Sequence, residues 1–279
     1  MPNTALISLL SLAAAVSWGA ADFSGGLASK KSNVYGVVLV AHAVGLVFNL
    51  ALAILWRDPW PGATSVLWGV AAGLVGAVGL VSLYRALAIG TMGVNAPVAA
   101  VVTGILPVAF TFLTLGLPTR LQIGGFVMAL VAIWLIAMPA GDLERPRGLG
   151  LAMLAGVGFS GFLLFIKLAG TVAKFWPLVG ARAASLAFMI VLASGMHVEW
   201  KTVRPYWRAM VFCGIFDSLG NILFVYAATR GRLDIAAVLS SLYPASTVIL
   251  ARLILKEKIG RVQAVGIALA LASVALIAA

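Results

Sequence analysis

The feature that most constrains this chain is a series of apolar stretches, each about 20 residues long and separated by short segments of charged or turn-forming residues. A helix needs about 20 residues to cross a membrane, because the hydrocarbon core is about 30 Å thick and each residue rises 1.5 Å. The stretches do not alternate between apolar and polar residues as the strands of a transmembrane barrel would. We therefore predict an all-α integral membrane protein with ten transmembrane helices, near residues 4–28, 34–56, 65–89, 93–116, 120–139, 148–169, 175–196, 207–228, 234–255 and 259–278.

The composition agrees with this fold class. Of the 279 residues, 63% are hydrophobic and 10% are charged, whereas a soluble domain has roughly 45–50% apolar and about 25% charged residues. The longest connections, near Gly141–Arg147 and His197–Tyr206, are too short to form a soluble domain. The first stretch has no basic residue before it, and nine spans follow it, so we interpret it as a helix and not as a signal peptide.

The sequence also excludes several classes of function. The net charge of +11 comes from basic residues at the ends of spans, where they contact anionic lipid, so we expect no nucleic-acid partner. The single cysteine, Cys213, cannot form an intrachain disulfide. No metal-binding, nucleotide-binding or nucleophile motif is present, so we expect no cofactor, no metal and no enzymatic activity.

The two sets of five spans align with each other, which predicts two repeats over residues 1–140 and 148–279. The first helices share an aromatic beside a small residue, and the third helices end in a tyrosine with an alanine two residues later. The fourth helices share a proline eight residues after an alanine, and the fifth share a glutamine three residues before a glycine. The matched residues are Trp18 and Phe159, Tyr84 and Tyr226, Pro107 and Pro244, and Gln122 and Gln263.

Because five is an odd number, the second repeat must enter the membrane from the opposite side. Transporters with such inverted repeats bind substrate near the midplane, between the repeats, and use interrupted helices there. Proline removes a backbone donor from a helix. We therefore predict that Pro97, Pro107 and Pro244 are helix-breaking hinges.

These motifs resemble the drug/metabolite transporter superfamily, in particular its ten-helix branch with two EamA-type repeats. Within that branch the chain is similar to the YddG-like group of bacterial exporters of aromatic and other amino acids. The resemblance covers the whole chain and rests on Trp18-Gly19, Tyr84, Tyr226, Pro107 and Pro244, and on Glu257 before Gln263 and Gly266. The first repeat has Gly116 where the family has the corresponding glutamate. The resemblance implies a multi-pass carrier of the inner (plasma) membrane that works by alternating access around a central cavity.

Polar residues inside the spans are candidates for the site, because a charge at a helix centre costs roughly 2.5–3.5 kcal/mol on insertion scales. Asp217 and Asn221 lie four residues apart, with Ser218 beside them, so they share one helix face. We interpret them as a polar wall that binds substrate or a proton; the alternative for Asp217 is a pairing with a neighbouring helix. His42 is a second candidate for a proton-linked residue.

Three other charged residues fit structural roles better. Asp22, with Ser24 close by, lies nearer to the membrane interface than to the centre of its span, so we favour a structural role for it. Lys167 and Arg182 are expected to extend towards the interface, with Lys167 the stronger case.

The remaining candidates are aromatic and small polar residues. Trp18, Phe159, Tyr84, Tyr226 and Tyr243 are expected to line a cavity and to offer ring faces to an aromatic or cationic substrate. Ser240 and Ser241 form a polar cluster ahead of Pro244, and Asn95 and Thr103 are their nearest equivalents in the first repeat. The glycines at 69, 73, 76 and 79 indicate close helix packing.

The orientation is left open by two conflicting arguments. Ten spans place both termini on one side, where the loops carry six basic residues, against ten on the other side. Positive-inside counting thus favours external termini, whereas the family resemblance implies cytoplasmic ones.

The leading hypothesis is a secondary transporter that exports amino acids, including aromatic and other neutral ones. We expect it to be a monomer with broad specificity. One alternative is a transporter of the same fold for other small metabolites or cationic drugs. A remote alternative is a channel or an intramembrane enzyme, in which Asp22 and Asp217 would form a dyad. The sequence does not decide whether protons are coupled to transport.

Overall fold

The computed structural model describes residues 4–90, 92–138, 147–170, 172–196, 198, 200–255 and 260–278. In these ranges the chain forms helices joined by short turns, with no β-strand. The helices are α1 (Thr4–Ser29), α2 (Val34–Leu55), α3 (Ala63–Ile89), α4 (Met92–Leu115), α5 (Arg120–Ala137), α6 (Leu149–Leu168), α7 (Trp176–Gly195), α8 (Trp200–Val203), η1 (Arg204–Tyr206), α9 (Trp207–Ala228), α10 (Leu233–Ser240), α11 (Tyr243–Leu255) and α12 (Arg261–Ala278). The all-α fold class is confirmed.

The helix bounds follow the predicted spans closely. Among the described residues, seven helices are long and apolar enough to cross a membrane. They are α1, α2, α3, α4, α6, α7 and the continuous run of α8, η1 and α9, Trp200–Ala228. The described apolar parts of α5 and α12 are shorter, Arg120–Ile136 and Arg261–Ala270. The ninth predicted span is two helices, α10 and α11.

The interruption between α10 and α11 lies where the sequence placed it. Pro244 stands in the first turn of α11, so it has no N–H to donate to the carbonyl of Ser240. The chain makes a tight turn instead, in which the Ser241 amide donates to Ala237 and the Leu242 amide donates to Leu239. The ninth span is therefore a broken helix.

The expectation of a break in the fourth span was wrong, because Pro97 and Pro107 both lie inside the continuous helix α4. Pro107 leaves the carbonyl of Thr103 without its usual helical donor. The hydroxyl of Ser160 in α6 donates to that carbonyl at 3.0 Å and to the carbonyl of Val102 at 3.0 Å. A neighbouring helix thus satisfies the freed carbonyl, and α4 stays continuous.

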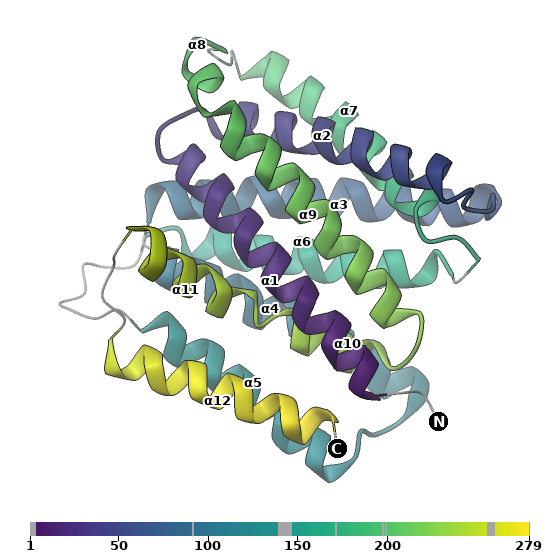
Figure 1. The fold of residues 1–279 in the computed structure, drawn as a ribbon, viewed down its shortest axis with the longest axis vertical. Helices are drawn as coiled ribbons and strands as arrows, with labels where there is room; N and C mark the ends of the chain where they lie inside the picture. The colour runs from purple at the N-terminus through teal and green to yellow at the C-terminus, as the bar shows by residue number, and fades with distance from the viewer. Residues whose placement is uncertain are drawn as a thin grey trace.

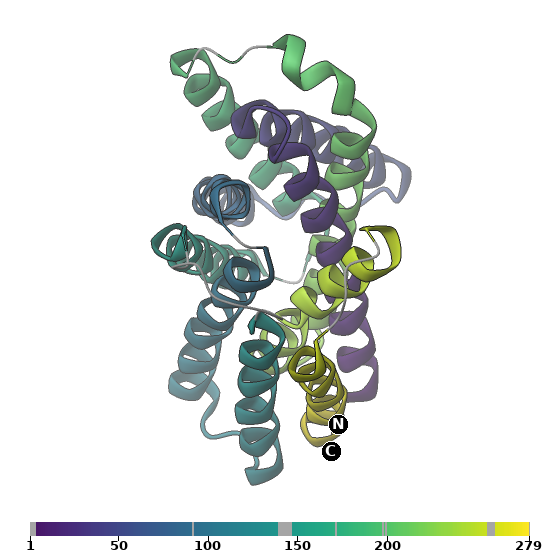
Figure 2. The same ribbon diagram turned by 90° about the vertical axis from the view of Figure 1, so that its left-hand side faces the viewer.

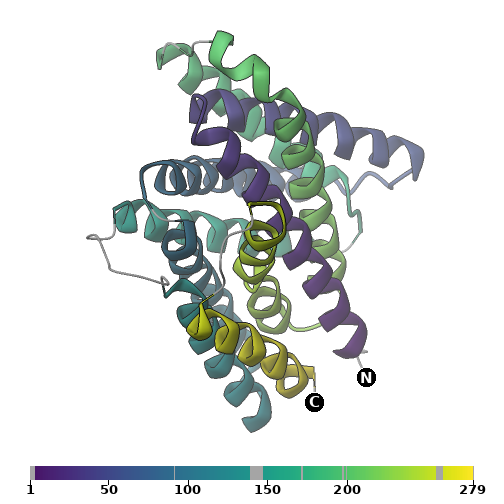
Figure 3. The same cartoon turned by 60° about the vertical axis from the view of Figure 1, so that its left-hand side comes forward.

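The two sets of five helices pack on each other reciprocally. The third helix of each set, α3 or α9, lies against the first helix of the other, α6 or α1. Likewise α4 packs on α6, and the broken pair α10 and α11 packs on α1. Helices α2 and α7 meet near one end of the molecule, and α5 lies beside α12 at the other (Figures 1 and 3). This reciprocity supports the predicted two-fold relation between the repeats.

The two ends of the described chain lie close together. Figures 1 and 2 show the N- and C-termini near each other at the lower part of the molecule. This placement fits an even number of membrane crossings, which puts both termini on one side.

Close contacts at glycines confirm the interpretation of the glycine series in α3. A Cβ atom added to Gly69 would lie 2.1 Å from the carbonyl oxygen of Pro177, and one added to Gly73 would lie 2.0 Å from that of Ala181. Both partners belong to α7. The absence of side chains lets the backbones of α3 and α7 touch, as is common between transmembrane helices.

Side chains in loops fix several helix ends. The Asp58 carboxylate, between α2 and α3, accepts hydrogen bonds from the amides of Lys174, Phe175 and Trp176 at the start of α7. These amides have no partner within the helix, and the helix N-terminus favours a negative charge. Thr119 and Gln122 form a reciprocal capping box at the start of α5.

Candidate functional site

A cavity lies between the two sets of helices. The space between its walls measures about 690 Å³, including the part open to solvent. Four helices of each set contribute, whereas α5 and α12 do not. The lining residues are Trp18 and Asp22 (α1), His42 (α2), Gly73, Gly76, Ala77 and Leu80 (α3), Thr103 (α4), Phe159, Phe162 and Leu163 (α6), Leu178, Ala181, Arg182 and Ser185 (α7), Asp217 and Asn221 (α9), and Tyr243 (α11).

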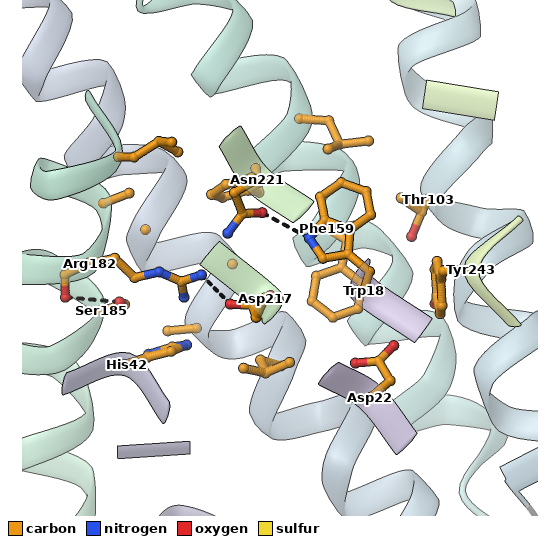
Figure 4. Close-up of a pocket in the computed structure, with 18 residues that line it drawn as sticks. Trp18, Asp22, His42, Thr103, Phe159, Arg182, Ser185, Asp217, Asn221 and Tyr243 are labelled. Carbon is orange, nitrogen blue, oxygen red and sulfur yellow. Dashed lines mark hydrogen bonds and ion pairs between the residues drawn. The ribbon is translucent and has the colours of Figure 1, made fainter. Parts of the chain in front are cut away.

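Aromatic rings form one part of the lining. Trp18 and Phe159, the matched residues of the two repeats, both reach the cavity (Figure 4). The Trp18 Nε1–H donates to Asn221 Oδ1 at 3.1 Å, and the Trp18 ring lies 5.8 Å from that of Phe224. The hydrogen bond fixes the indole against α9. Both Trp18 and Asn221 were predicted from the sequence.

An ion pair forms another part of the lining. Arg182 Nη2 of α7 pairs with Asp217 Oδ2 of α9 (Figure 4). The two side chains are only 8% and 17% exposed. Gly45 of α2 gives the arginine room, because a Cβ there would lie 3.0 Å from Arg182 Nε. The expectation that Arg182 extends to the membrane interface was wrong. Its guanidinium instead lies inside the bundle, where Asp217 supplies the counter-ion that a buried charge requires.

Asp22 lies on the same cavity, and its residue is 7% exposed. Within the described ranges, the ion pairs are Arg182–Asp217 and Arg232–Asp234, so no cation is paired with Asp22. A buried acidic group without a counter-ion inside a span marks a candidate functional site.

His42 occupies the part of the cavity next to Arg182 (Figure 4). It is 2% exposed, and its Nδ1 atom has no hydrogen-bond partner in the described structure. The Nδ1 atom of His42 is therefore free to form a hydrogen bond with a ligand in the cavity.

Thr103 and Tyr243, also predicted, complete the polar lining. Thr103 Oγ1 donates to the carbonyl of Ala99 at 2.8 Å, one turn earlier in α4. Tyr243 donates its hydroxyl to the carbonyl of Ala96 at 3.2 Å and so links α11 to α4. Seven residues of the predicted substrate-binding and proton-linked set thus meet in one cavity: Trp18, His42, Thr103, Phe159, Asp217, Asn221 and Tyr243.

Five predicted residues lie outside the lining. Tyr84 is fully buried behind Asp22, and its hydroxyl contacts the Cys213 thiol at 3.1 Å. Asn95 is also buried, and its Nδ2 donates to the carbonyls of Ala86 and Arg147, which ties the end of α3 to the start of α6.

The other three satisfy backbone groups or cover a charge. Ser240 donates its hydroxyl to the Ser11 carbonyl in α1, and Ser241 donates to the Ala237 carbonyl within the turn between α10 and α11. The Tyr226 ring lies 4.9 Å below the guanidinium carbon of Arg230, at the end of α9. Of these contacts, the one between Ser240 and Ser11 joins α10 to α1, and the other two are local.

Two further sequence features can be placed. Lys167 donates to the carbonyl of Ala228 and, at 3.5 Å, to that of Gly231, so it stabilises the C-terminal end of α9. Glu257, which contributed to the family resemblance, lies outside the described residues.

Sequence reasoning missed Arg182 and Asp22 as cavity residues, along with Ser185 and Phe162. One available signal was the pair of opposite charges inside separate spans, since a buried charge requires a counter-ion. The described residues contain no group of three histidine, cysteine, aspartate or glutamate side chains that could hold a metal ion.

Comparisons with known proteins agree with this description. Residues 146–279 match the sequence profile of the EamA-like transporter family. This family consists of transporters, in agreement with the prediction that the chain is not an enzyme. No curated protein sequence matches the chain significantly.

Solved structures share the fold. The matches comprise 29 chains, among them a crystal structure whose title names no particular protein. It superposes with a TM-score of 0.75 at 18% sequence identity, over 97% of this chain and 95% of the other. The similarity concerns the fold alone.

Proposed function

We propose that the chain is a secondary transporter that exports amino acids, including aromatic and other neutral ones. The match of residues 146–279 to the EamA-like transporter family is the premise. One observation carries this proposal: the cavity between the two sets of helices has aromatic rings on one wall and buried charges on another. No nucleotide-binding motif occurs in the sequence, so we do not expect ATP to be the direct energy source.

The lining suits an amino acid with an aromatic or apolar side chain. Trp18, Phe159 and Phe162 offer ring faces and edges, and aromatic pairs contribute about 0.5–1.5 kcal/mol beyond the burial of area. The nearby carboxylates and guanidinium can bind the ammonium and carboxylate groups of the same molecule. Such a lining combines an apolar pocket with a few polar groups that fix orientation.

The charges weigh against a phosphate-bearing substrate. Among the described residues, Arg182 is the only arginine or lysine on the cavity lining, and it is already paired with Asp217. Phosphates are usually bound by several arginines or lysines, or by helix N-termini. Nucleotide sugars and sugar phosphates are thus poorer candidates than amino acids.

A difference between the two repeats supports alternating access. In the second repeat, Ser160 of α6 contacts the carbonyls of Val102 and Thr103 in α4. At the matching position of the first repeat, the carbonyl of Gly19 in α1 accepts from Thr247 of α11. When Pro107 is aligned with Pro244, Thr247 corresponds to residue 110, about two helical turns beyond Val102 and Thr103.

The related halves are therefore packed in two different registers, and one contains a broken helix where the other is continuous. An exchange of these two arrangements would move the opening of the cavity from one side of the membrane to the other, as in other inverted-repeat transporters. We expect this exchange to occur around the fixed cavity, in a monomer of the inner (plasma) membrane.

Counterflow in proteoliposomes tests the proposal. Vesicles loaded with unlabelled tryptophan should take up labelled tryptophan above the level of protein-free vesicles, and other neutral amino acids should compete. The absence of counterflow for every amino acid in a panel would refute amino acid transport.

Two phenylalanine variants identify the site. Phe159→Ala removes a ring from the cavity and should raise the apparent KM for tryptophan roughly threefold to tenfold. Phe112→Ala removes a ring that is 47% exposed on α4 and lies off the lining, so its KM should not change. Equal effects of both variants would place the substrate elsewhere.

A further inference from the structure

The charged side chains around the cavity do not balance. Its lining contains the carboxylates of Asp22 and Asp217 and one guanidinium, that of Arg182. Arg182 and Asp217 neutralise each other as an ion pair. With His42 neutral, one negative charge is left over on Asp22.

The position of Asp22 makes this charge consequential. It lies in α1 with only 7% of its surface exposed, and no cation in the described part of the chain pairs with it. Tyr243 lies on the same lining, but a phenol carries no positive charge. A buried carboxylate requires a counter-ion or a proton, and a ligand bound in the cavity can supply the counter-ion.

The surroundings of Asp22 indicate what that counter-ion is attached to. Trp18 lies one helical turn before Asp22 on the same face of α1, and both side chains reach the cavity beside Phe159 (Figure 4). A ligand with a cation at Asp22 would therefore place its next atoms against aromatic rings. A protonated amine on a short carbon chain has this shape.

Arg182 has capacity to spare for a second group. Its pairing with Asp217 uses Nη2, whereas a guanidinium has five N–H donors. His42 beside it has an Nδ1 atom without a partner among the described residues. A carboxylate on the same ligand can be bound there, but the ion pair already neutralises that region, so it contributes less than the amine.

We propose that Asp22 binds the ammonium group of the substrate, so that a protonated amine is required for recognition and a carboxylate is not. This inference rests on the proposed function and specifies the substrate class of the same cavity as primary amines with an apolar or aromatic side chain. It assigns a binding role to Asp22, for which the position near the end of its predicted span had suggested a structural role.

A comparison of three indoles tests the requirement in the wild-type protein. Tryptophan has both charged groups, tryptamine lacks the carboxylate, and indole-3-propionate lacks the amine. In tryptophan counterflow, tryptamine should compete within about tenfold of tryptophan, and indole-3-propionate should compete at least 100-fold more weakly. Equal competition by tryptophan and indole-3-propionate would overturn the proposal.

Variants at position 22 test the residue. Asp22→Asn keeps the size of the side chain but removes its charge, and the apparent affinity for tryptophan and tryptamine should fall roughly 10- to 100-fold. Asp22→Glu retains the charge and should restore part of this affinity. Ser24→Ala is the matched control, because Ser24 is a buried residue of α1 whose hydroxyl donates to the Ala21 carbonyl and which lies off the lining; it should leave the affinity unchanged.

The outcomes separate the two proposals. If the wild-type protein moves no amino acid, the proposed function fails. If it moves tryptophan, but Asp22→Asn does so with unchanged affinity, only the role of Asp22 fails. If Asp22→Asn does not fold, the comparison of the three indoles in the wild-type protein still decides the requirement for an amine.

Discussion

The ion pair between Arg182 and Asp217 allows a quantitative prediction. Replacing Asp217 with asparagine would leave the Arg182 guanidinium buried, at 8% side-chain exposure, without a paired carboxylate. Removing one partner of a buried pair costs about 3–5 kcal/mol. Because this pair borders a cavity that water can enter, we expect the lower end, about 3 kcal/mol. For a chain of this size this corresponds to a decrease in Tm of roughly 6–12 °C.

A double-mutant cycle isolates the interaction. Arg182→Gln and Asp217→Asn should each destabilise the protein, and the double variant should be more stable than the sum of the two single effects predicts, by about 1–3 kcal/mol. Thermal unfolding of the four proteins in one detergent, followed by tryptophan fluorescence, measures this difference. Arg85→Gln serves as the control, since Arg85 is an exposed residue that only reaches the Tyr35 hydroxyl at 3.4 Å.

Additive effects would refute the reasoning. If the double variant were as unstable as the two single variants together, Arg182 and Asp217 would act independently. The same conclusion would follow if Asp217→Asn changed Tm no more than Arg85→Gln does. The position of Asp217 in the middle of α9 would then need another explanation.

Two further predictions concern packing and helix ends. Gly73→Ala should lower the stability by about 1–3 kcal/mol, because the added Cβ would lie 2.0 Å from the Ala181 carbonyl oxygen and force α3 away from α7. Gly124→Ala is the control and should not lower Tm, because a Cβ at Gly124 would have no neighbour within 4 Å. Equal decreases in Tm for the two variants would contradict the packing argument. Asp58→Asn should lower the stability by about 1 kcal/mol, because it removes the negative charge at the start of α7, and an unchanged Tm would show that these hydrogen bonds do not depend on that charge.

The helices could be predicted closely from the sequence, because a spanning helix requires a nearly uninterrupted apolar run and short polar connections mark its ends. The break at Pro244 followed from the missing donor of proline. The continuity of α4 could not be predicted from the sequence, because it depends on the hydroxyl of Ser160. That residue lies more than 50 positions along the chain, and its contact with α4 exists only after the two helices pack.

The candidate site could be predicted in part. Trp18 and Phe159 were found because the repeat places them at matching positions, and Asn221 because an amide inside a span is conspicuous. Arg182 and Asp22 were missed, because depth along a helix does not show which face a side chain takes. Only the packing of α7 and α9 on their shared neighbour α2 shows that Arg182 is buried beside a carboxylate.

The central claim is that substrate passes through the cavity between the two sets of helices, and cysteine labelling tests it most directly. Cys213 is the only cysteine, so Cys213→Ala gives a background for Thr103→Cys, on the lining, and Thr114→Cys, an exposed position of the same helix. A small thiol reagent should modify Thr103→Cys more slowly when tryptophan is present, and the modified protein should lose counterflow. Thr114→Cys should show neither effect. Modification of Thr103→Cys that is insensitive to tryptophan and leaves counterflow intact would contradict the account.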